Sequence, residues 1–255
     1  MLSKQNTFYD INQIKNKVPH SEAILNDFYQ LWDNKTLSTS QLEIMLANYF
    51  FRTIHTVTRV CDVVRALIDP LLIIKSPLYR KAIVNNLENL CDELGYGENK
   101  NPHILLLCEW INTLLTKAGS KNVPIEENYT KFVTSETQEF VKIQKDLYND
   151  ESLPVIVGAS FAQELFADYM MKQLNNGYVK NYQHLFNDKE DFNLTTKYFS
   201  VHLDEGTEEN HALLIEEVIK LICKTPEDFE KVNYSYDCFE RITSNFWRGI
   251  YTKLF

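Results

Sequence analysis

Apolar residues recur at steps of three and four along most of this chain, and this spacing constrains its fold more than any other feature. In residues 21–32 the spacing is carried by Ile24, Phe28, Leu31 and Trp32. Such steps place apolar side chains on one face of a helix. Seven glycines and seven prolines in 255 residues are few for the many tight turns of an all-β fold. The pattern predicts an all-α protein.

Helix starts and breaks divide the chain into segments. Ser38 is a suitable N-cap with Gln41 at the capping-box position, and the helix that it opens is expected to reach about residue 68, before Pro70. No Gly-, Ser- or Pro-rich linker separates halves of different composition, so we expect residues 1–255 to form a single domain. Further helices are expected at 76–93, 103–118, 126–148, 153–175, 191–204, 207–223 and 234–253.

Composition and charge argue against several classes of protein. A net charge of −9 gives no electrostatic footprint for nucleic acid, and no apolar run is long enough for a membrane span. The first residues lack the apolar core of a signal peptide. The five cysteines are odd in number and contain no Cys-x-x-Cys pair, which favours free thiols over disulfides or a zinc site. We therefore expect a cytoplasmic protein without nucleic-acid or membrane partners.

Residues 198–211 concentrate the side chains that bind metals. His202, Asp204, Glu208 and His211 lie in this short segment, which has no cysteine, and the whole chain has only six histidines. Imidazole and carboxylate together form the ligand set of iron, manganese and zinc. The segment is therefore a candidate metal site.

A second acidic cluster lies about a hundred residues upstream. Glu93 falls in the last turn of one expected helix, and His103 falls in the first turn of the next. A carboxylate at a helix C-terminus meets the negative end of the helix dipole, and a nearby cation would remove that penalty. Taken alone, the cluster also fits a solvated acidic turn with a surface histidine.

Glu164 is the third candidate, in the most apolar expected helix of the chain. Phe161, Leu165 and Phe166 surround it in sequence, while Gly158 and Ala162 allow close helix contact. If Glu164 points inward, it needs a metal or a basic partner. An ordinary exposed glutamate on an amphipathic helix fits the same sequence.

At these three places the sequence resembles the heme-oxygenase-like diiron oxidases and oxygenases. Their relatives include protein C of pyrroloquinoline quinone biosynthesis, the thiaminase-II group (TenA fold) and the chlamydial protein associating with death domains. The resemblance covers nearly the whole chain in helical layout. It is carried by Asp92-Glu93-Leu94-Gly95-x-Gly97 with His103, by Glu164, and by Tyr198-Phe199-x-x-His202 with Glu208-x-x-His211.

The resemblance implies a compact, heme-oxygenase-like bundle of about seven helices with a buried active site. It also implies a non-heme diiron enzyme that activates O₂ on a small-molecule substrate, such as an amino acid, a fatty acid or a cofactor precursor. Two iron ions, or manganese, would be the cofactors, with O₂ as co-substrate; a homodimer is compatible with it. The implied metal ligands are Glu93, His103, Glu164, His202, Glu208 and His211.

The last motif departs from the pattern of that family. The family places three residues between the first histidine and the acid, whereas five residues separate His202 from Glu208. On a regular helix, at about 100° per residue, Asp204, Glu208 and His211 would share a face and His202 would point nearly opposite. Either Gly206 interrupts the helix and His202 is the ligand, or Asp204 replaces it. We favour His202.

Other functions remain open at this level. A metal-free enzyme of the same fold could be a cofactor-independent oxidase or a thiaminase, whose nucleophile would be Cys108 or Cys61. A heme oxygenase would need an axial histidine, for which His20 is the candidate. A non-enzymatic interaction protein is a further alternative. Arg52 or Arg59 could bind a carboxylate substrate, but we favour the interpretation that both are exposed arginines on an amphipathic helix.

Overall fold

Helices make up almost all of the structure, a computed structural model that describes residues 11–96, 101–203 and 207–255, with the backbone alone for 207–210. Within these ranges there is no β-strand. This confirms the prediction of an all-α fold. Among the same residues, no helix is both long and apolar enough to cross a membrane.

The helices that form the body of the bundle differ greatly in length. The longest are α10 (Leu153–Tyr182) and α14 (Pro226–Lys253). The others are α1 (Ile11–Lys17), α2 (Asp27–Asn34), α3 (Thr39–Thr53), α4 (Thr56–Leu67), α5 (Pro70–Lys75), α6 (Pro77–Glu93), α7 (His103–Lys117), α8 (Ile125–Asn128), α9 (Ser135–Tyr148), α11 (Lys189–Thr195), α12 (Lys197–Leu203) and α13 (Thr207–Ile222). The described chain therefore has more helical segments than the bundle of about seven that the resemblance implied.

Threonine side chains that bond to nearby carbonyls lie at two of the additional breaks. The helix expected from Ser38 to about residue 68 is divided into α3 and α4, where Thr53 Oγ1 donates to the Tyr49 carbonyl and Thr56 Oγ1 donates to the Thr53 carbonyl. The helix expected at 191–204 is divided into α11 and α12 beside Thr196, whose Oγ1 donates to the Asn193 carbonyl. Hydroxyl groups that bond to nearby carbonyls compete with regular helical bonding.

Two other expected boundaries were wrong because capping residues lie elsewhere. The helix expected at 126–148 is divided into α8 and α9, and Thr134 caps α9 by accepting from the Thr137 backbone. The helix expected at 234–253 begins earlier, at Pro226, because Thr225 and Asp228 form a capping box.

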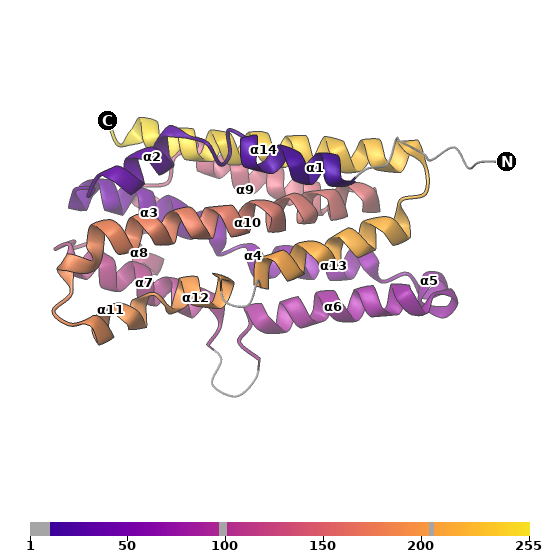
Figure 1. The fold of residues 1–255 in the computed structure, drawn as a ribbon, viewed down its shortest axis with the longest axis horizontal. Coiled ribbons are helices and arrows are strands. Elements are labelled where there is room, and N and C mark those ends of the chain that lie inside the picture. The colour runs from indigo at the N-terminus through magenta and orange to yellow at the C-terminus, as the bar shows by residue number, and fades with distance from the viewer. Residues whose placement is uncertain (1–10, 97–100, 204–206) are drawn as a thin grey trace.

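Helix α10 lies in the middle of the bundle, with α14 above it and α13 and then α6 below it in the view of Figure 1. A Cβ atom on Gly158 would overlap α14 at Ser235, and one on Gly177 would overlap Trp32 of α2. The indole Nε1 of Trp32 also donates to the Leu174 carbonyl at 2.9 Å. Small residues on α10 therefore allow the close packing that the sequence suggested.

The C-terminal end of α6, the first turn of α7 and helix α12 lie near one another on the lower side of the bundle (Figure 1). Gly95, which has a φ of +68°, follows the C-terminus of α6. A side chain at Gly95 would overlap the backbone of Pro102, which immediately precedes α7. A glycine is required there both for its backbone conformation and for this close approach.

Candidate metal centre

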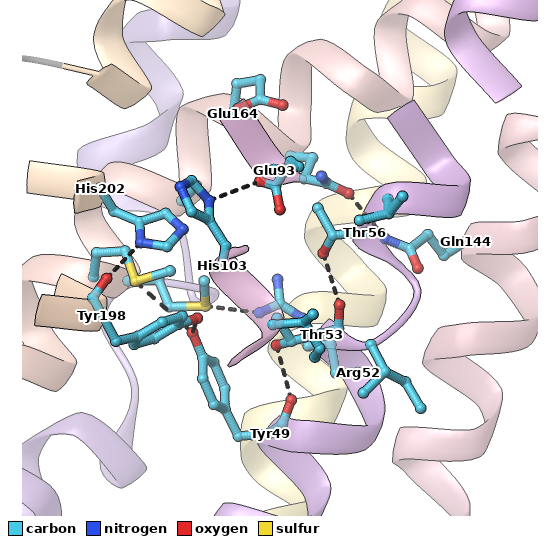
Figure 2. A pocket seen from close by; sticks show the side chains of 17 residues that line it. Tyr49, Arg52, Thr53, Thr56, Glu93, His103, Gln144, Glu164, Tyr198 and His202 are labelled. Carbon is cyan, nitrogen blue, oxygen red and sulfur yellow. Dashed lines mark hydrogen bonds and ion pairs between the residues drawn. The ribbon is translucent and has the colours of Figure 1, made fainter. Parts of the chain in front are cut away.

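Glu93, His103 and His202 come together although they belong to three different helices. Glu93 ends α6, His103 begins α7, and His202 lies on α12. One potential ligand atom from each lies within 4.8 Å of the others. Figure 2 shows the three side chains grouped, with His103 Nδ1 3.4 Å from Glu93 Oε1 and the two imidazole centroids 4.5 Å apart. One carboxylate and two imidazoles in this arrangement are a suitable ligand set for one transition-metal ion.

The orientation of His202 is set by a backbone hydrogen bond. Its Nδ1 lies 2.6 Å from the carbonyl oxygen of Tyr198, one helical turn earlier. Because a carbonyl can only accept, Nδ1 carries the proton and Nε2 carries the lone pair. A histidine that binds a metal through one nitrogen commonly donates its other N–H to a carbonyl in this way.

Tyr198 is in turn held by the core. Its hydroxyl lies 2.7 Å from that of Tyr49, and its ring stacks on Trp110 with a centroid separation of 5.5 Å. The spacing between Tyr198 and His202 is therefore structural: a buried aromatic residue fixes the turn of helix from which the imidazole projects.

Glu164 and His211 form a second pair of candidate ligands. Glu164 lies on α10 and His211 on α13, with Glu164 Oε2 3.7 Å from His211 Nδ1. Glu164 is 6% exposed and His211 is 8% exposed, so both are buried. The inward orientation of Glu164, which the sequence left open, is thus established in this structure. We refer to Glu93, His103, His202, Glu164 and His211 as the candidate metal centre.

The protonation state of each ionisable side chain in the candidate metal centre depends on its neighbours. Burial, and next the neighbouring His103, lower the pKa of His202 to about 4, so its ring is neutral near pH 7. Burial alone would raise the pKa of Glu93, but His103, His202 and His211 keep it below the ordinary value. Burial opposes a charge on His211, but the Glu164 and Glu93 carboxylates raise its pKa.

The donor atoms present fit a metal ion. His103 Nδ1 is buried and makes no hydrogen bond, although it lies 3.4 Å from Glu93 Oε1 in an ion-pair contact. A buried polar atom without a partner is costly and calls for a ligand. A metal ion bound by Glu93, His103 and His202 would give His103 Nδ1 the partner that it lacks. His202 would bind the same ion through the lone pair on its Nε2.

Two residues of the predicted ligand set cannot be placed. Asp204 lies outside the described residues, as does the side chain of Glu208. His202 and His211 belong to separate helices, α12 and α13, rather than to one regular helix. His202 adjoins Glu93 and His103, and the choice of His202 over Asp204 stays a prediction.

A pair of substitutions distinguishes these two interpretations. We expect His202→Ala to abolish binding at one iron position, because it removes one of about three protein ligands to that ion. Asp204→Ala should change iron content little. Iron per chain is measured after anaerobic loading and desalting. The reverse order would identify Asp204 as the ligand, and equal tolerance of both changes would contradict both interpretations.

A pocket of about 70 Å³ opens beside this centre, measured as the space available to the centres of water molecules. Its lining combines metal-centre residues with polar and apolar side chains of α3, α9 and α10, including Arg52, Gln144, Gln163, Met170 and Met171 (Figure 2). The pocket suits a small ligand placed next to a metal.

The cysteines that a thiaminase would need as nucleophile, and the histidine that a heme oxygenase would need as axial ligand, do not line this pocket. Cys108 and Cys61 are absent from its lining, and Cys61 is exposed. Burial raises the pKa of Cys108 to about 11, which leaves almost no thiolate near pH 7. His20 is exposed at the end of the short 3-10 helix Val18–His20. The structure therefore does not favour a thiaminase nucleophile or an axial heme ligand at these positions.

The fold is similar to those of several solved structures. A CADD-like protein of unknown function from Nostoc punctiforme PCC 73102 is 16% identical, with a TM-score of 0.69 over 94% of this chain and 95% of that one. A TenA homolog from Pseudomonas syringae pv. tomato DC3000 is 13% identical, with a TM-score of 0.72 over 94% and 92%. A domain of unknown function with a heme oxygenase-like fold from Shewanella denitrificans OS217 is 15% identical, with a TM-score of 0.67 over 96% and 93%.

These similarities extend over nearly the whole chain and confirm the predicted heme-oxygenase-like fold. At such low identity they show the fold alone. No protein-family model and no curated protein matches the sequence.

Proposed function

We propose that this protein is a non-heme diiron enzyme that uses O₂ to oxidise or oxygenate a small molecule. The observation that carries the proposal is the grouping of Glu93, His103 and His202 beside the Glu164–His211 pair, at a pocket inside a heme-oxygenase-like bundle. A chain that used its fold only to bind a protein partner would have no need for this buried ligand set.

Charge balance favours two ions. Two ferrous ions carry four positive charges, and Glu93, Glu164 and Glu208 would supply three negative ones. Such a site is nearly neutral when loaded, which makes its burial tolerable. When bound, the iron ions would supply the electrons and open coordination positions that O₂ activation requires.

The protein side chains have their own roles in this proposal. The Tyr198 carbonyl holds His202 in the tautomer that carries the lone pair on Nε2, the nitrogen that would bind a metal. Met170 and Met171 line the pocket with apolar surface and limit the access of water to the centre. The remaining polar residues of the lining are available to orient a substrate.

Oxygen uptake distinguishes this proposal from its alternatives. Protein that has been loaded anaerobically with Fe(II), desalted and mixed with buffered O₂ should consume O₂ in proportion to its bound iron, and chelator-treated protein should not. Equal consumption without iron would indicate a cofactor-independent oxidase of the same fold. An absence of bound iron, together with an absence of uptake, would leave the interaction protein as the better interpretation.

A further inference from the structure

Arg52 is a buried cation in the same pocket. The residue lies on α3, is only 7% exposed, and lines the pocket together with four residues of the candidate metal centre, Glu93, His103, Glu164 and His202 (Figure 2). Its Nη1 contacts the sulfur of Met170 at 2.7 Å, and its Nε is buried without a hydrogen-bond partner. The guanidinium lies 4.8 Å from the ring centroid of Phe140 and 5.4 Å from that of Phe246.

A second buried arginine shows what Arg52 lacks. Arg59, on α4, is 4% exposed and donates to the Asp62 carboxylate at 2.9 Å. In the described part of the chain, no carboxylate forms an ion pair with Arg52. The expectation that both arginines are exposed was wrong, since both are buried; of the two, only Arg52 lines the pocket and lacks an acidic partner.

A buried guanidinium without an anion is unfavourable. Burial lowers the pKa of Arg52, and the groups that oppose this effect are the hydroxyls of four tyrosines, none of them a carboxylate: Tyr49, Tyr29, Tyr198 and Tyr148. Arginine nevertheless stays charged in proteins. The aromatic rings and the methionine sulfur beside the Arg52 guanidinium compensate only part of the hydration that it loses on burial. An anion from outside the chain would therefore stabilise the site.

Gln144, on α9, places a second unsatisfied atom in the pocket lining. Its Nε2 donates to Gln163 Oε1 at 2.9 Å, and that oxygen also accepts from the Tyr148 hydroxyl. The remaining Oε1 of Gln144 is buried without a partner. This oxygen accepts hydrogen bonds, so it suits an amino or hydroxyl group of a ligand.

We propose that the pocket binds a small carboxylic acid, with the carboxylate held by Arg52 and an amino or hydroxyl group received by Gln144. The planar guanidinium presents a fork of N–H donors that matches a carboxylate in two-point contact. The inference rests on the proposed function in that this acid would be the substrate brought beside the metal centre. Binding of the acid, however, requires only Arg52 and the pocket.

Binding is tested with six-carbon probes on the full chain, in metal-free and iron-loaded forms. The probes are hexanoate and norleucine, with hexanamide and norleucinamide as controls that lack the carboxylate. Calorimetry and thermal shift should detect both acids and neither amide. In Arg52→Gln the affinity for the acids should fall about 30-fold or more, because a buried charge pair loses one partner.

Two further variants separate recognition from folding. Arg52→Lys keeps the charge but loses the fork, and should weaken acid binding without changing iron content. Arg59→Lys makes the same change outside the pocket and should bind the acids as the wild type does. Arg52→Met should melt no lower than the wild type in the absence of ligand, since it removes an uncompensated charge.

The proposal is overturned if neither acid stabilises the metal-free or the iron-loaded wild type, if the amides bind as tightly as the acids, or if Arg52→Gln binds the acids unchanged. Because acid binding is measured without metal as well as with it, a protein that binds acids but no iron would overturn the proposed function and leave this inference standing.

Discussion

Replacing His103 by alanine is expected to remove most of the iron from one position of the centre. The His103 imidazole is one of about three protein ligands to its ion. Among the described residues, the group that could bind this ion consists of Glu93, His103 and His202, so no fourth side chain replaces the lost imidazole. We expect iron affinity at that position to fall by about 100-fold or more, above the usual effect of changing a group that only orients a ligand. His211→Ala should produce a comparable loss at the second position. Iron per chain after anaerobic loading and desalting measures both.

His184→Ala is the matched control, because it removes an exposed histidine that does not line the pocket. It should retain the iron content and thermal stability of the wild type. If His103→Ala and His211→Ala both bound iron as fully as this control, the assignment of the centre would be wrong.

Glu164→Gln should separate metal binding from folding. The amide keeps the shape and hydrogen-bonding capacity of the side chain but removes the negative charge that balances the metal ions. Iron affinity and O₂ consumption should fall by about tenfold or more. The metal-free fold should be as stable as that of the wild type or slightly more so, because a buried carboxylate is costly and His211 can lose its proton. Iron analysis, O₂ uptake and thermal melts of the metal-free proteins measure these effects.

Asp168→Asn is the matched control for Glu164→Gln, because it makes the same acid-to-amide change at another position on α10. Asp168 pairs with Lys172 at 2.7 Å in an i,i+4 ion pair, and its side chain does not line the pocket. Its loss should cost about 0.3–0.5 kcal/mol of stability and no iron. A Glu164→Gln protein with the iron content and activity of this control would exclude Glu164 from the site.

The existence of the long helices could be predicted from the sequence, because apolar periodicity and caps are local signals. The capping box of Ser38 and Gln41 is present as expected, and the helix expected at 103–118 corresponds closely to α7. The breaks at Thr56 and Thr196 were missed, because a hydroxyl that bonds to a carbonyl leaves no mark on the apolar pattern. Such breaks depend on which of several local hydrogen bonds the packed chain selects.

The site residues differ in how far the sequence could identify them. His202 stood out because it lies in a dense cluster of ligand types, but its pairing with Glu93 and His103 rested on the resemblance to a family. The inward orientation of Glu164 could not be derived, since the part of α10 around it is mostly apolar and does not mark one side of the helix as exposed. Arg52 and Gln144 were not distinguished for the same physical reason: whether a polar atom lacks a partner depends on residues that are distant in sequence.

The most direct test of the account is to locate iron in the protein. Crystals of anaerobically Fe(II)-loaded protein should show two peaks in an anomalous difference map collected at the iron edge. One peak should lie between Glu93, His103 and His202, and the other beside Glu164 and His211, each about 2.0–2.2 Å from its nitrogen and oxygen ligands. Loaded crystals with no peak among these side chains, or with iron only at surface residues, would contradict the claim that this bundle holds a diiron centre.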